Sequence, residues 1–407
     1  MSKDTFLKGN SVIKLYKGGK SLNRKGLAVG LILLLIGTSV IPAIAQVVEK
    51  PSQTSRGNWL YIGGSGPGNY TKIQDAIDNT SDGDTVFVYS GVYYERIVIP
   101  QAISLIGESK NTTVIDAINS DVGELIYLKS DNITISGFTL RFNGDWGNPR
   151  VIISNINYHE GTKNITISNN ILQADVSFPC IRLYRCDFCT ITQNIFYLLN
   201  YSDGIELSWG TNCTITNNLM NTVDIGNGIL GIELSNIFYS TISNNSIISN
   251  HLGCGLSYSK FNTISHNHFY RNNVAIRIAS SYNNSIISNH IENPIYTQGR
   301  NPAVIGIREM DSSWFNIIEK NFISHFMFGI FIDKSYYTVI SMNTFMKNIF
   351  HARFSNTGFS SGTIWKENYW GRPRILPKPI FGIKNIYYSY PGFIEFDWHP
   401  AQKPYDI

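Results

Sequence analysis

The chain has 407 residues, of which 43% are hydrophobic and only 15% are charged, so it has enough apolar residues for a sizeable core in one large domain or two. Its formal net charge of +4 comes from residues 1–45. The rest of the chain has 26 basic and 28 acidic side chains and no basic run, which excludes charge-driven nucleic-acid binding. The five cysteines are too few for a disulfide scaffold.

The N-terminus has the pattern of an export signal. Seven basic side chains precede the apolar run GLAVGLILLLIGTSVIPAIA at residues 26–45. A basic stretch, an apolar stretch and a small-x-small site predict a signal peptide, and an uncleaved membrane anchor is the alternative. Both place the rest of the chain outside the cytoplasm, secreted or on the cell surface. Residues 46–57 form a linker, and nine later Asn-x-Ser/Thr sites are candidates for glycosylation.

The first predicted element is a short helix near residues 71–79. Thr71 and Gln74 have the spacing of a capping box, and Ile73, Ala76 and Ile77 share one helical face. The strand-like segments GDTVFVYSGVYYERIVI and ISLIGE follow. An open sheet end would expose a strand edge to partners, so we expect this helix to cover one end of the fold.

The middle of the chain repeats the motif N-x-T-I-x-x-N, seen for example as NITISNNIL at 164–172 and NCTITNNLM at 212–220. An isoleucine stands three residues before the second asparagine of each copy, and Phe138 takes the asparagine place in an earlier copy. The second asparagine recurs every 22 to 32 residues, at Asn170, Asn194, Asn218, Asn245, Asn267, Asn289, Asn321 and Asn343.

A second series of short segments lies between these motifs: CIRL at 180–183, GIEL at 204–207 and 231–234, GCGL at 253–256, AIRI at 275–278, GIRE at 306–309 and GIFI at 329–332. Such apolar–polar alternation predicts strands. Strand repeats of this length without helices predict one parallel β-helix of roughly ten to twelve coils, over residues 58–371. Equivalent residues then form columns, with isoleucines in the core and inward asparagines that bond one another at the turns. Residues 372–407, rich in proline and aromatic residues, predict an irregular C-terminal cap.

These motifs resemble those of a known family. The stretch KIQDAID…GDTVFV…GVYYE…ISLIGE resembles the start of pectate-lyase-like right-handed β-helices, and the asparagine coils resemble NosD-type repeats, also described as a carbohydrate-binding and sugar-hydrolysis domain. The tail WGRPRILPKPI…FDWHPAQKPYDI resembles exported archaeal members of that group. The resemblance covers residues 58–407 and implies an all-β, right-handed solenoid outside the cytoplasm. NosD itself implies copper delivery to a periplasmic reductase, but activity does not follow from fold.

Related β-helix enzymes act on acidic polysaccharides with carboxylates clustered on one outer sheet, so the outward column of the second series is the candidate site. Glu206 and Glu233 lie on adjacent coils, ~4.8 Å apart, as a candidate acid and base. The candidate substrate-binding residues around them are Arg182, Arg277, Arg308 and Trp209. An ordinary ladder of exposed ion pairs is the competing interpretation.

Longer segments at 141–150, 221–230 and 293–304 mark a variable corner of the coils. Binding residues concentrate in such loops, and Trp146, Tyr296 and Arg300 could stack on or bond to sugars. The competing interpretation is that these loops only cover the edge of the sheet.

Two further groups of residues suggest metal or sulfur chemistry. His268 and His290 share one column on adjacent coils, and imidazole suits copper or zinc, although solvated surface histidines fit the pattern too. No other cofactor is evident. Cys189 and Cys213 share a column, which predicts a disulfide or a stacked pair of thiols, while Cys254 replaces a core isoleucine.

Together these features favour an exported surface protein that binds carbohydrate or another extended polymer along its stacked face. A polysaccharide hydrolase, lyase or epimerase is the first alternative, and a NosD-like periplasmic copper-handling protein is the second. A purely structural role in the envelope is the third. The expected partner is a polysaccharide or glycan, with no nucleic acid, and with a membrane only through an uncleaved N-terminal segment.

Overall fold

The computed structural model describes residues 57–117, 123–143, 150–155, 161–175, 178–199, 202–222, 229–294, 304–355, 362–385 and 388–407. The predicted signal or anchor at 1–45 lies outside these residues. Within them, no helix is long and apolar enough to span a membrane. The described chain is a parallel β-solenoid of about 12 coils with almost no helix, which confirms the predicted fold class.

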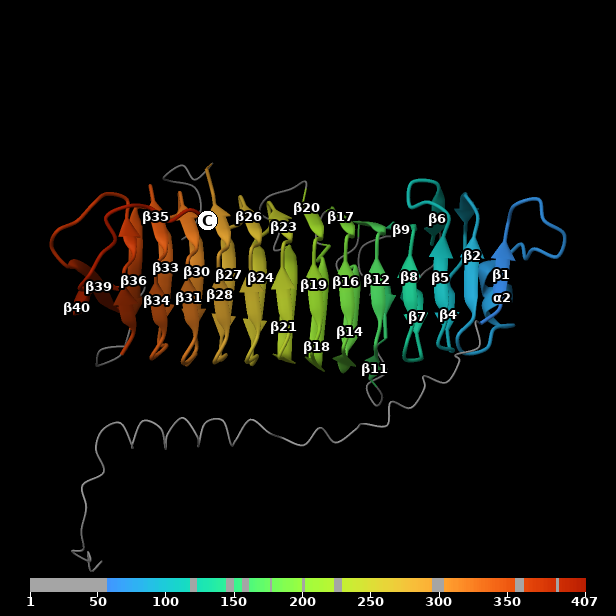
Figure 1. Cartoon of the computed structure of the whole chain (residues 1–407), viewed down its shortest axis with the longest axis horizontal. Coiled ribbons are helices and arrows are strands. Elements are labelled where there is room, and N and C mark those ends of the chain that lie inside the picture. The colour runs from blue at the N-terminus through green and yellow to red at the C-terminus, as the bar shows by residue number, and fades with distance from the viewer. Residues whose placement is uncertain are drawn as a thin grey trace, which may run out of the picture. The chain divides into compact units, whose positions relative to one another are not determined.

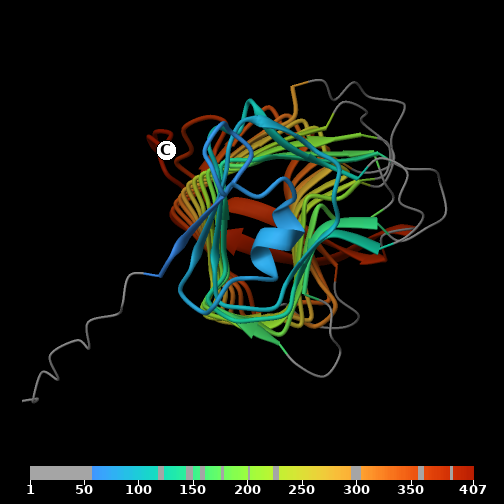
Figure 2. The ribbon, with the colours of Figure 1, turned by 90° about the vertical axis from the view of Figure 1, so that its right-hand side faces the viewer.

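Each coil presents up to three strands, which stack into three faces; Figure 1 shows the coils side by side in chain order, and Figure 2 shows them superimposed around one ring. The long-strand face consists of β4 (Ile97–Ile99), β7 (Gly123–Leu128), β10 (Arg150–Ser154), β14 (Ile181–Tyr184), β18 (Ile205–Thr211), β21 (Leu230–Phe238), β24 (Leu252–Ser257), β27 (Val274–Ala279), β30 (Ile305–Met310), β33 (Phe328–Asp333), β36 (Phe350–Ser355) and β39 (Lys378–Asn385).

The short-strand face, which belongs to the same 28-stranded sheet, consists of β1 (Trp59–Ile62), β2 (Thr85–Val88), β5 (Ser104–Gly107), β8 (Thr134–Ser136), β12 (Thr166–Ser168), β16 (Thr190–Thr192), β19 (Thr214–Thr216), β22 (Thr241–Ser243), β25 (Thr263–Ser265), β28 (Ser285–Ile287), β31 (Ile317–Glu319), β34 (Val339–Ser341), β37 (Ile364–Lys366) and β40 (Tyr388–Asp397). Two short pieces at the corner between these faces are β11 (Thr162–Lys163) and β15 (Cys186–Asp187).

The third face is a separate 12-stranded sheet, made of β3 (Gly91–Tyr93), β6 (Thr113–Asp116), β9 (Thr139–Asn143), β13 (Ile171–Asp175), β17 (Ile195–Leu198), β20 (Leu219–Thr222), β23 (Ser246–Ile248), β26 (His268–Tyr270), β29 (His290–Glu292), β32 (Phe322–Ser324), β35 (Thr344–Met346) and β38 (Tyr369–Trp370). Its strands are as short as those of the short-strand face, because each coil must turn again within a few residues.

Inward and outward side chains alternate along each short strand, and the inward ones fill the core. The central isoleucine of each TIS-like strand points inward and pairs in register with the isoleucine of the next coil, as Ile191 does with Ile215. These isoleucines are at most 1% exposed. Because every coil repeats the arrangement, the core is a set of stacked apolar columns, as the sequence predicts.

The repeated asparagines form a buried hydrogen-bonded column, named here the Asn column, at the corner between the short-strand face and the third face. Asn267 shows the pattern: its amide nitrogen donates to the Ile242 carbonyl at 2.9 Å and to Asn289 Oδ1 at 3.0 Å. Its own Oδ1 accepts the backbone and side-chain N–H of Asn245. The column begins where the Phe138 N–H donates to Asn170 Oδ1. The predicted inward, mutually bonded asparagines are therefore confirmed.

The turn beside the Asn column falls one residue earlier than the sequence suggests. The residue before each column asparagine takes the left-handed conformation, for example Asn217 at φ 56° and His266 at φ 55°. The column asparagine itself is not among the positive-φ residues described. Its role is therefore to bond buried backbone groups, while its neighbour makes the turn.

A second inward column lies at the corner between the long-strand and short-strand faces, and its composition changes from coil to coil. Its members, which stand directly before the short strands, are Ile133, Ile165, Cys189, Cys213, Ser240, Asn262, Asn284, Asn316 and Thr338. We name it the mixed column. All of its members are buried.

The mixed column ends on a buried acid. Asn316 donates its side-chain N–H to Glu309 at 2.8 Å, and the Thr338 hydroxyl lies 2.8 Å from both Glu309 oxygens. Glu309 is fully buried, in register with Ile278 and Ile332 of the neighbouring coils. Burial raises its pKa from 4.5 to about 7, against the opposing effect of these hydrogen bonds.

The predicted helix is present as α2 (Ile73–Ile77) and lies across one end of the ring (Figure 2), with Ile73, Ala76 and Ile77 buried. The predicted capping box is wrong, because Lys72 is at the N-cap and makes no side-chain capping bond. Instead, the Glu95 carboxylate accepts the N–H groups of Ile73 and Gln74 at 2.9 and 3.0 Å. The capping carboxylate lies 22 residues after Ile73 and 21 after Gln74, so the local pattern did not show it.

The C-terminal cap is more regular than the sequence indicates. Strands β39 and β40 pair antiparallel, with two register shifts, at the other end of the solenoid (Figure 1). Asp397 of the DWHP stretch lies inside the fold and closes the Asn column: it accepts the backbone and side-chain N–H of Asn368 at 2.9 and 3.2 Å. The Trp370 indole also donates to it, at 3.0 Å.

Candidate functional site

The predicted outward column on the long-strand face exists. Parallel pairing places Arg182, Glu206, Glu233, Gly255, Arg277, Arg308, Phe331 and Arg353 in one row along the axis. Charged side chains occupy the first coils of this row. Phe331 is buried in a small outer apolar cluster with Ile305 and Phe328, so the row is interrupted there.

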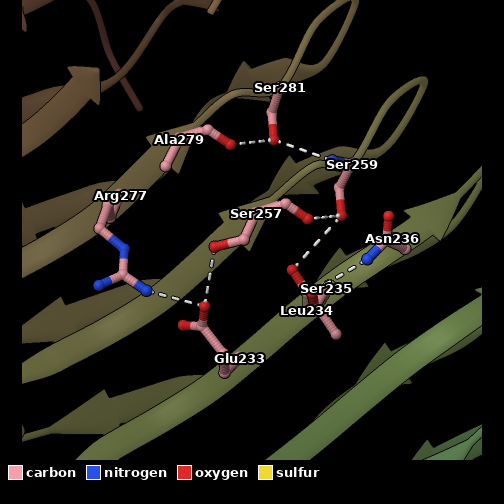
Figure 3. A network of polar contacts seen from close by, with 9 residues as sticks. All are labelled: Glu233, Leu234, Ser235, Asn236, Ser257, Ser259, Arg277, Ala279 and Ser281. Carbon is pink, nitrogen blue, oxygen red and sulfur yellow. Dashed lines mark hydrogen bonds and ion pairs between the residues drawn. The ribbon is translucent and has the colours of Figure 1, made fainter. Parts of the chain in front are cut away.

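Each glutamate of the row has an arginine partner. Arg182 Nε lies 3.0 Å from Glu206 Oε2, and Arg277 Nη2 lies 2.7 Å from Glu233 Oε1. Figure 3 shows Glu233 pointing past the intervening coil to Arg277, with the Ser257 hydroxyl donating to it at 3.1 Å. Gly255 makes this reach possible, because a Cβ atom there would collide with Glu233 Oε2.

Two acids of this region, Glu233 and Asp203, have raised pKa values. Burial raises the pKa of Glu233, and Arg277 opposes that effect. Asp203, next to the same strand, accepts the Leu230 N–H at 2.7 Å. Burial raises the pKa of Asp203 to about 6, and the charges of Glu206 and Glu233 add to this effect. A proton is thus available near neutral pH, while both glutamates are ion-paired.

A row of exposed aromatic rings borders these charges, and the sequence analysis noticed only Trp209 of it. The row lies at the corner that also holds the mixed column, and its rings are between 40% and 63% exposed. We name it the aromatic ridge; it consists of Phe188, Trp209, Tyr239, Tyr258, Phe261, Tyr282, Trp314, Phe315 and Tyr337. Within it, Tyr239 and Phe261 stack with centroids 5.0 Å apart, and Phe315 and Tyr337 with centroids 5.4 Å apart.

The long-strand face becomes basic towards its C-terminal end. Arg353, Arg372, Arg374 and Lys378 gather there, and in the described part of the chain none of them forms an ion pair with a carboxylate. Burial and the three arginines lower the pKa of Lys378. Arg353 packs 4.3 Å from the Phe350 ring centre. This end of the face suits an anionic ligand.

The predicted loop residues Trp146, Tyr296 and Arg300 lie outside the described residues. Arg308, the last predicted binding residue, is described and lies 3.7 Å from Asp333.

The predicted histidine pair is brought together on the third face. His268 and His290 are in register on β26 and β29, with ring centres 5.3 Å apart. His290 Nε2 also lies 3.6 Å from Glu292 Oε2. One nitrogen or oxygen from each of the three side chains lies within 4.8 Å of the others, a spacing that two imidazoles and a carboxylate need to share one ion.

The five cysteines are free in the structure, so of the two alternatives predicted for Cys189 and Cys213, a disulfide or a stacked pair of thiols, it contains the pair of thiols. The two do share the mixed column, as predicted. A third sulfur lies beside them: Cys213 Sγ faces Cys186 Sγ at 3.8 Å, and the sulfurs of Cys186, Cys189 and Cys213 all lie within 4.8 Å of one another. Cys254 is buried in register with Ile232 and Ile276, as expected of a core replacement.

Comparison with known protein families assigns the chain to one of them. Residues 77–306, more than half of it, match the model described as periplasmic copper-binding protein (NosD). The chain belongs to the NosD family. No curated protein matches the sequence.

Solved structures similar to this NosD-family chain are β-helix proteins. A DFA-IIIase from Arthrobacter chlorophenolicus A6, without its lid and in complex with GF2, has 12% identity and a TM-score of 0.57, covering 77% of this chain and 94% of its own. A PL6 alginate lyase in complex with a trisaccharide has 12% identity and a TM-score of 0.54, covering 86% and 93%. The A-module of Azotobacter vinelandii mannuronan C-5 epimerase AlgE4 has 14% identity and a TM-score of 0.49, covering 72% and 94%. At these identities the likeness shows the fold alone.

Proposed function

We propose that this NosD-family solenoid acts outside the cytoplasm and binds an extended, acidic carbohydrate polymer along the corner between its long-strand and short-strand faces. The aromatic ridge is the observation that carries the proposal. Its rings follow the axis over many coils, and a polymer lying along the axis would meet one coil after another at ~4.8 Å intervals. Aromatic faces stack on the apolar faces of sugar rings.

The aromatic residues of the ridge are unfavourable for the stability of the fold, which supports a role in binding. Phe188, Tyr239, Phe261, Phe315 and Tyr337 stand at one turn position, all with φ between 52° and 59°. Other coils place asparagine there, as at Asn212 and Asn283. A left-handed conformation costs a bulky residue ~1–2 kcal/mol, and an exposed ring adds apolar surface in water. Asparagine would meet the needs of the turn alone.

The charges beside the ridge support an acidic polymer. Arg182 and Arg277 are held in place by their glutamates, and the basic C-terminal end of the face has no described counter-charge. Arginine binds carboxylate groups through two parallel hydrogen bonds. Structural relatives crystallised with sugars make a carbohydrate ligand reasonable, although their likeness extends to the fold alone.

The test compares the purified full chain with the double variant Tyr239→Asn, Phe261→Asn in affinity electrophoresis with alginate, polygalacturonate and a neutral glucan. Asparagine is the residue that other coils use at this turn, so the fold should survive. An aromatic contact contributes ~0.5–1.5 kcal/mol, so losing two should weaken retention by roughly tenfold or more. The control variant Trp59→Asn, Tyr94→Asn removes exposed rings outside the ridge and should bind like the parent chain.

Equal retention of the ridge variant and the parent chain would refute a role for the ridge. Release of sugar products in the same samples would instead favour a polysaccharide-acting enzyme. Products that are lost in Glu206→Gln or Glu233→Gln would then assign the catalytic pair.

A second candidate function, metal handling, is favoured by the His268–His290–Glu292 group. Two imidazoles and a carboxylate fit a copper or zinc ion, and these residues would hold it at the surface of the third face. Dialysis against Cu²⁺ should load about one ion in the parent chain and none there in His268→Ala, His290→Ala. Unchanged loading in that variant would exclude this group.

A further inference from the structure

We propose that Cys186, Cys189 and Cys213 form a binding site for one soft monovalent metal ion, Cu⁺, inside the solenoid. This site is separate from the polymer-binding corner surface and from the surface histidines. It rests on the convergence of three sulfurs from two adjacent coils, not on any activity of the protein.

The three cysteines come from different strands and meet at one point. Cys186 is the first residue of β15, Cys189 directly precedes β16, and Cys213 directly precedes β19 in the next coil. They are 0%, 1% and 2% exposed. Because all three sulfurs face the inside of the same corner, they form a compact cluster and are not scattered core cysteines.

The distances fit a shared ion better than a bond. The Cys186 and Cys213 sulfurs are 3.8 Å apart, and every sulfur pair lies within 4.8 Å. A disulfide requires ~2.05 Å. With metal–sulfur bonds of ~2.3 Å, two sulfurs on one ion are separated by roughly 3.8 to 4.0 Å. Small side-chain rotations of the wider pairs complete that geometry.

The neighbouring coil leaves room for the cluster. The pairing of Asp187 with Thr211 brings Gly210 beside Cys186. A Cβ atom at Gly210 would lie 3.1 Å from Cys186 Sγ and would collide with the Cys186 carbonyl. Gly210 is not among the glycines with positive φ, so this close approach is its local explanation. In the following coil the same position is Ile237.

The other two cysteines show what an isolated core thiol looks like. Cys180 and Cys254 are fully buried and belong to no group of potential ligands among the described residues. Cys254 simply continues an isoleucine column. Apolar packing therefore accounts for single cysteines in this core, but it does not require three sulfurs at one point.

The ligand set selects the ion. Thiolates favour soft ions such as Cu⁺, and no oxygen or nitrogen ligand joins the three sulfurs in the described cluster. Structural zinc sites are almost always four-coordinate, so three sulfurs serve zinc poorly. Cu⁺ accepts a planar set of three. Its binding displaces thiol protons to solvent. Release of one proton leaves the Cu⁺ site neutral, and each further proton released adds one negative charge that must be buried.

The burial of the site predicts how it is loaded. A folded chain gives no open path to residues that are at most 2% exposed, so the ion should enter as the chain folds. The experiment therefore refolds the full chain under argon with Cu⁺ supplied as its acetonitrile complex. The sample is then passed over a Cu⁺ chelator, and bound copper, free thiols and X-ray absorption are measured.

The neighbouring coils supply substitutions that should fold. Serine follows Cys213 in the mixed column at Ser240, and isoleucine precedes Cys189 at Ile165, so Cys213→Ser and Cys189→Ile use residues already tolerated there. The control is Cys254→Ala, which keeps the cluster. The parent chain and the control should retain about one copper per chain with sulfur-only coordination. Cys213→Ser and Cys189→Ile should each lose at least nine-tenths of it.

Three results would overturn the proposal. One is a parent chain that keeps five titratable thiols yet retains no copper. Another is a metal-free native chain with only three titratable thiols, which would show a disulfide. The third is copper retained equally by Cys213→Ser, with nitrogen ligands in the absorption spectrum, which would place the ion at the histidines. Polymer retention by the same samples is independent, so its failure would concern the proposed function alone.

Discussion

The two inward columns of the solenoid perform the same task in different ways. The Asn column uses one residue type in coil after coil, from Asn170 to Asn368. The mixed column passes from isoleucine through cysteine and serine to asparagine and threonine. Both end on a buried carboxylate, Asp397 in one and Glu309 in the other.

The difference shows what each corner demands. At the Asn column, the side chain must bond a backbone carbonyl of the preceding coil and an amide of the next one, so only asparagine serves. At the mixed column, apolar and sulfur side chains are tolerated, which means that the backbone there makes fewer demands. Different residue types can therefore occupy the mixed column in different coils, as the cysteine cluster shows.

Breaking the Asn column should have the largest effect. In Asn267→Leu, both N–H groups of Asn245 lose their acceptor and the Ile242 carbonyl loses a donor. Each buried polar group left unpaired costs ~1–3 kcal/mol, so we expect a loss of about 5 kcal/mol in the free energy of unfolding. Urea titration measures it. The exposed Asn221→Leu is the matched control, and a loss below ~1 kcal/mol in Asn267→Leu would contradict the role of the column.

Removing the end of the same column should be nearly as damaging. Asp397→Ala leaves the two N–H groups of Asn368 and the Trp370 indole without an acceptor, and we expect a loss of about 4 kcal/mol. Asp397→Asn keeps one oxygen and should recover part of it. Asp406→Ala, an exposed acid of the same tail, should unfold with the parent chain. Equal stability of all three variants would show that the carboxylate is dispensable.

The end of the mixed column should respond to pH. The pKa of Glu309 is raised from 4.5 to about 7 in the folded state, so folding binds protons between these values and stability falls as pH rises through them. The shift corresponds to about 3 kcal/mol at alkaline pH. Glu309→Gln should match the parent chain at pH 4 and exceed its stability at pH 8. A constant difference between the two chains across that range would contradict the buried acid.

Surface ion pairs should matter least for folding. Arg182 and Glu206 are 36% and 27% exposed, so Arg182→Ala should cost below ~1 kcal/mol in thermal unfolding. Its effect should instead appear as weaker, salt-sensitive retention on acidic polysaccharide. The control Lys347→Ala removes an exposed cation that directly follows β35 of the third face, away from the ridge. Loss of several kcal/mol in Arg182→Ala would mean that this row is structural.

The sequence revealed the columns because stacking repeats them. Counting residues between coils was enough to predict the length of the repeat and the columns of isoleucine and asparagine. It also predicted the row from Arg182 to Arg308. The aromatic ridge was missed because asparagine and aromatic residues alternate at its turn position, which hides it as a pattern. Glu95 and Asp397 were missed for another reason: their partners lie in other coils or in the caps, and no local spacing records those contacts.

The Asn column also gives the solenoid a direction. From Asn170 to Asn343, every side-chain amide in it donates one N–H to the asparagine of the next coil, which presents its oxygen to the preceding one. Such aligned dipoles add, as they do along a helix, and leave partial positive charge at the donor end. Asp397 places a carboxylate there. A coil duplicated within the column would lengthen the protein and keep both ends intact, so repeat number can change without redesign of either cap.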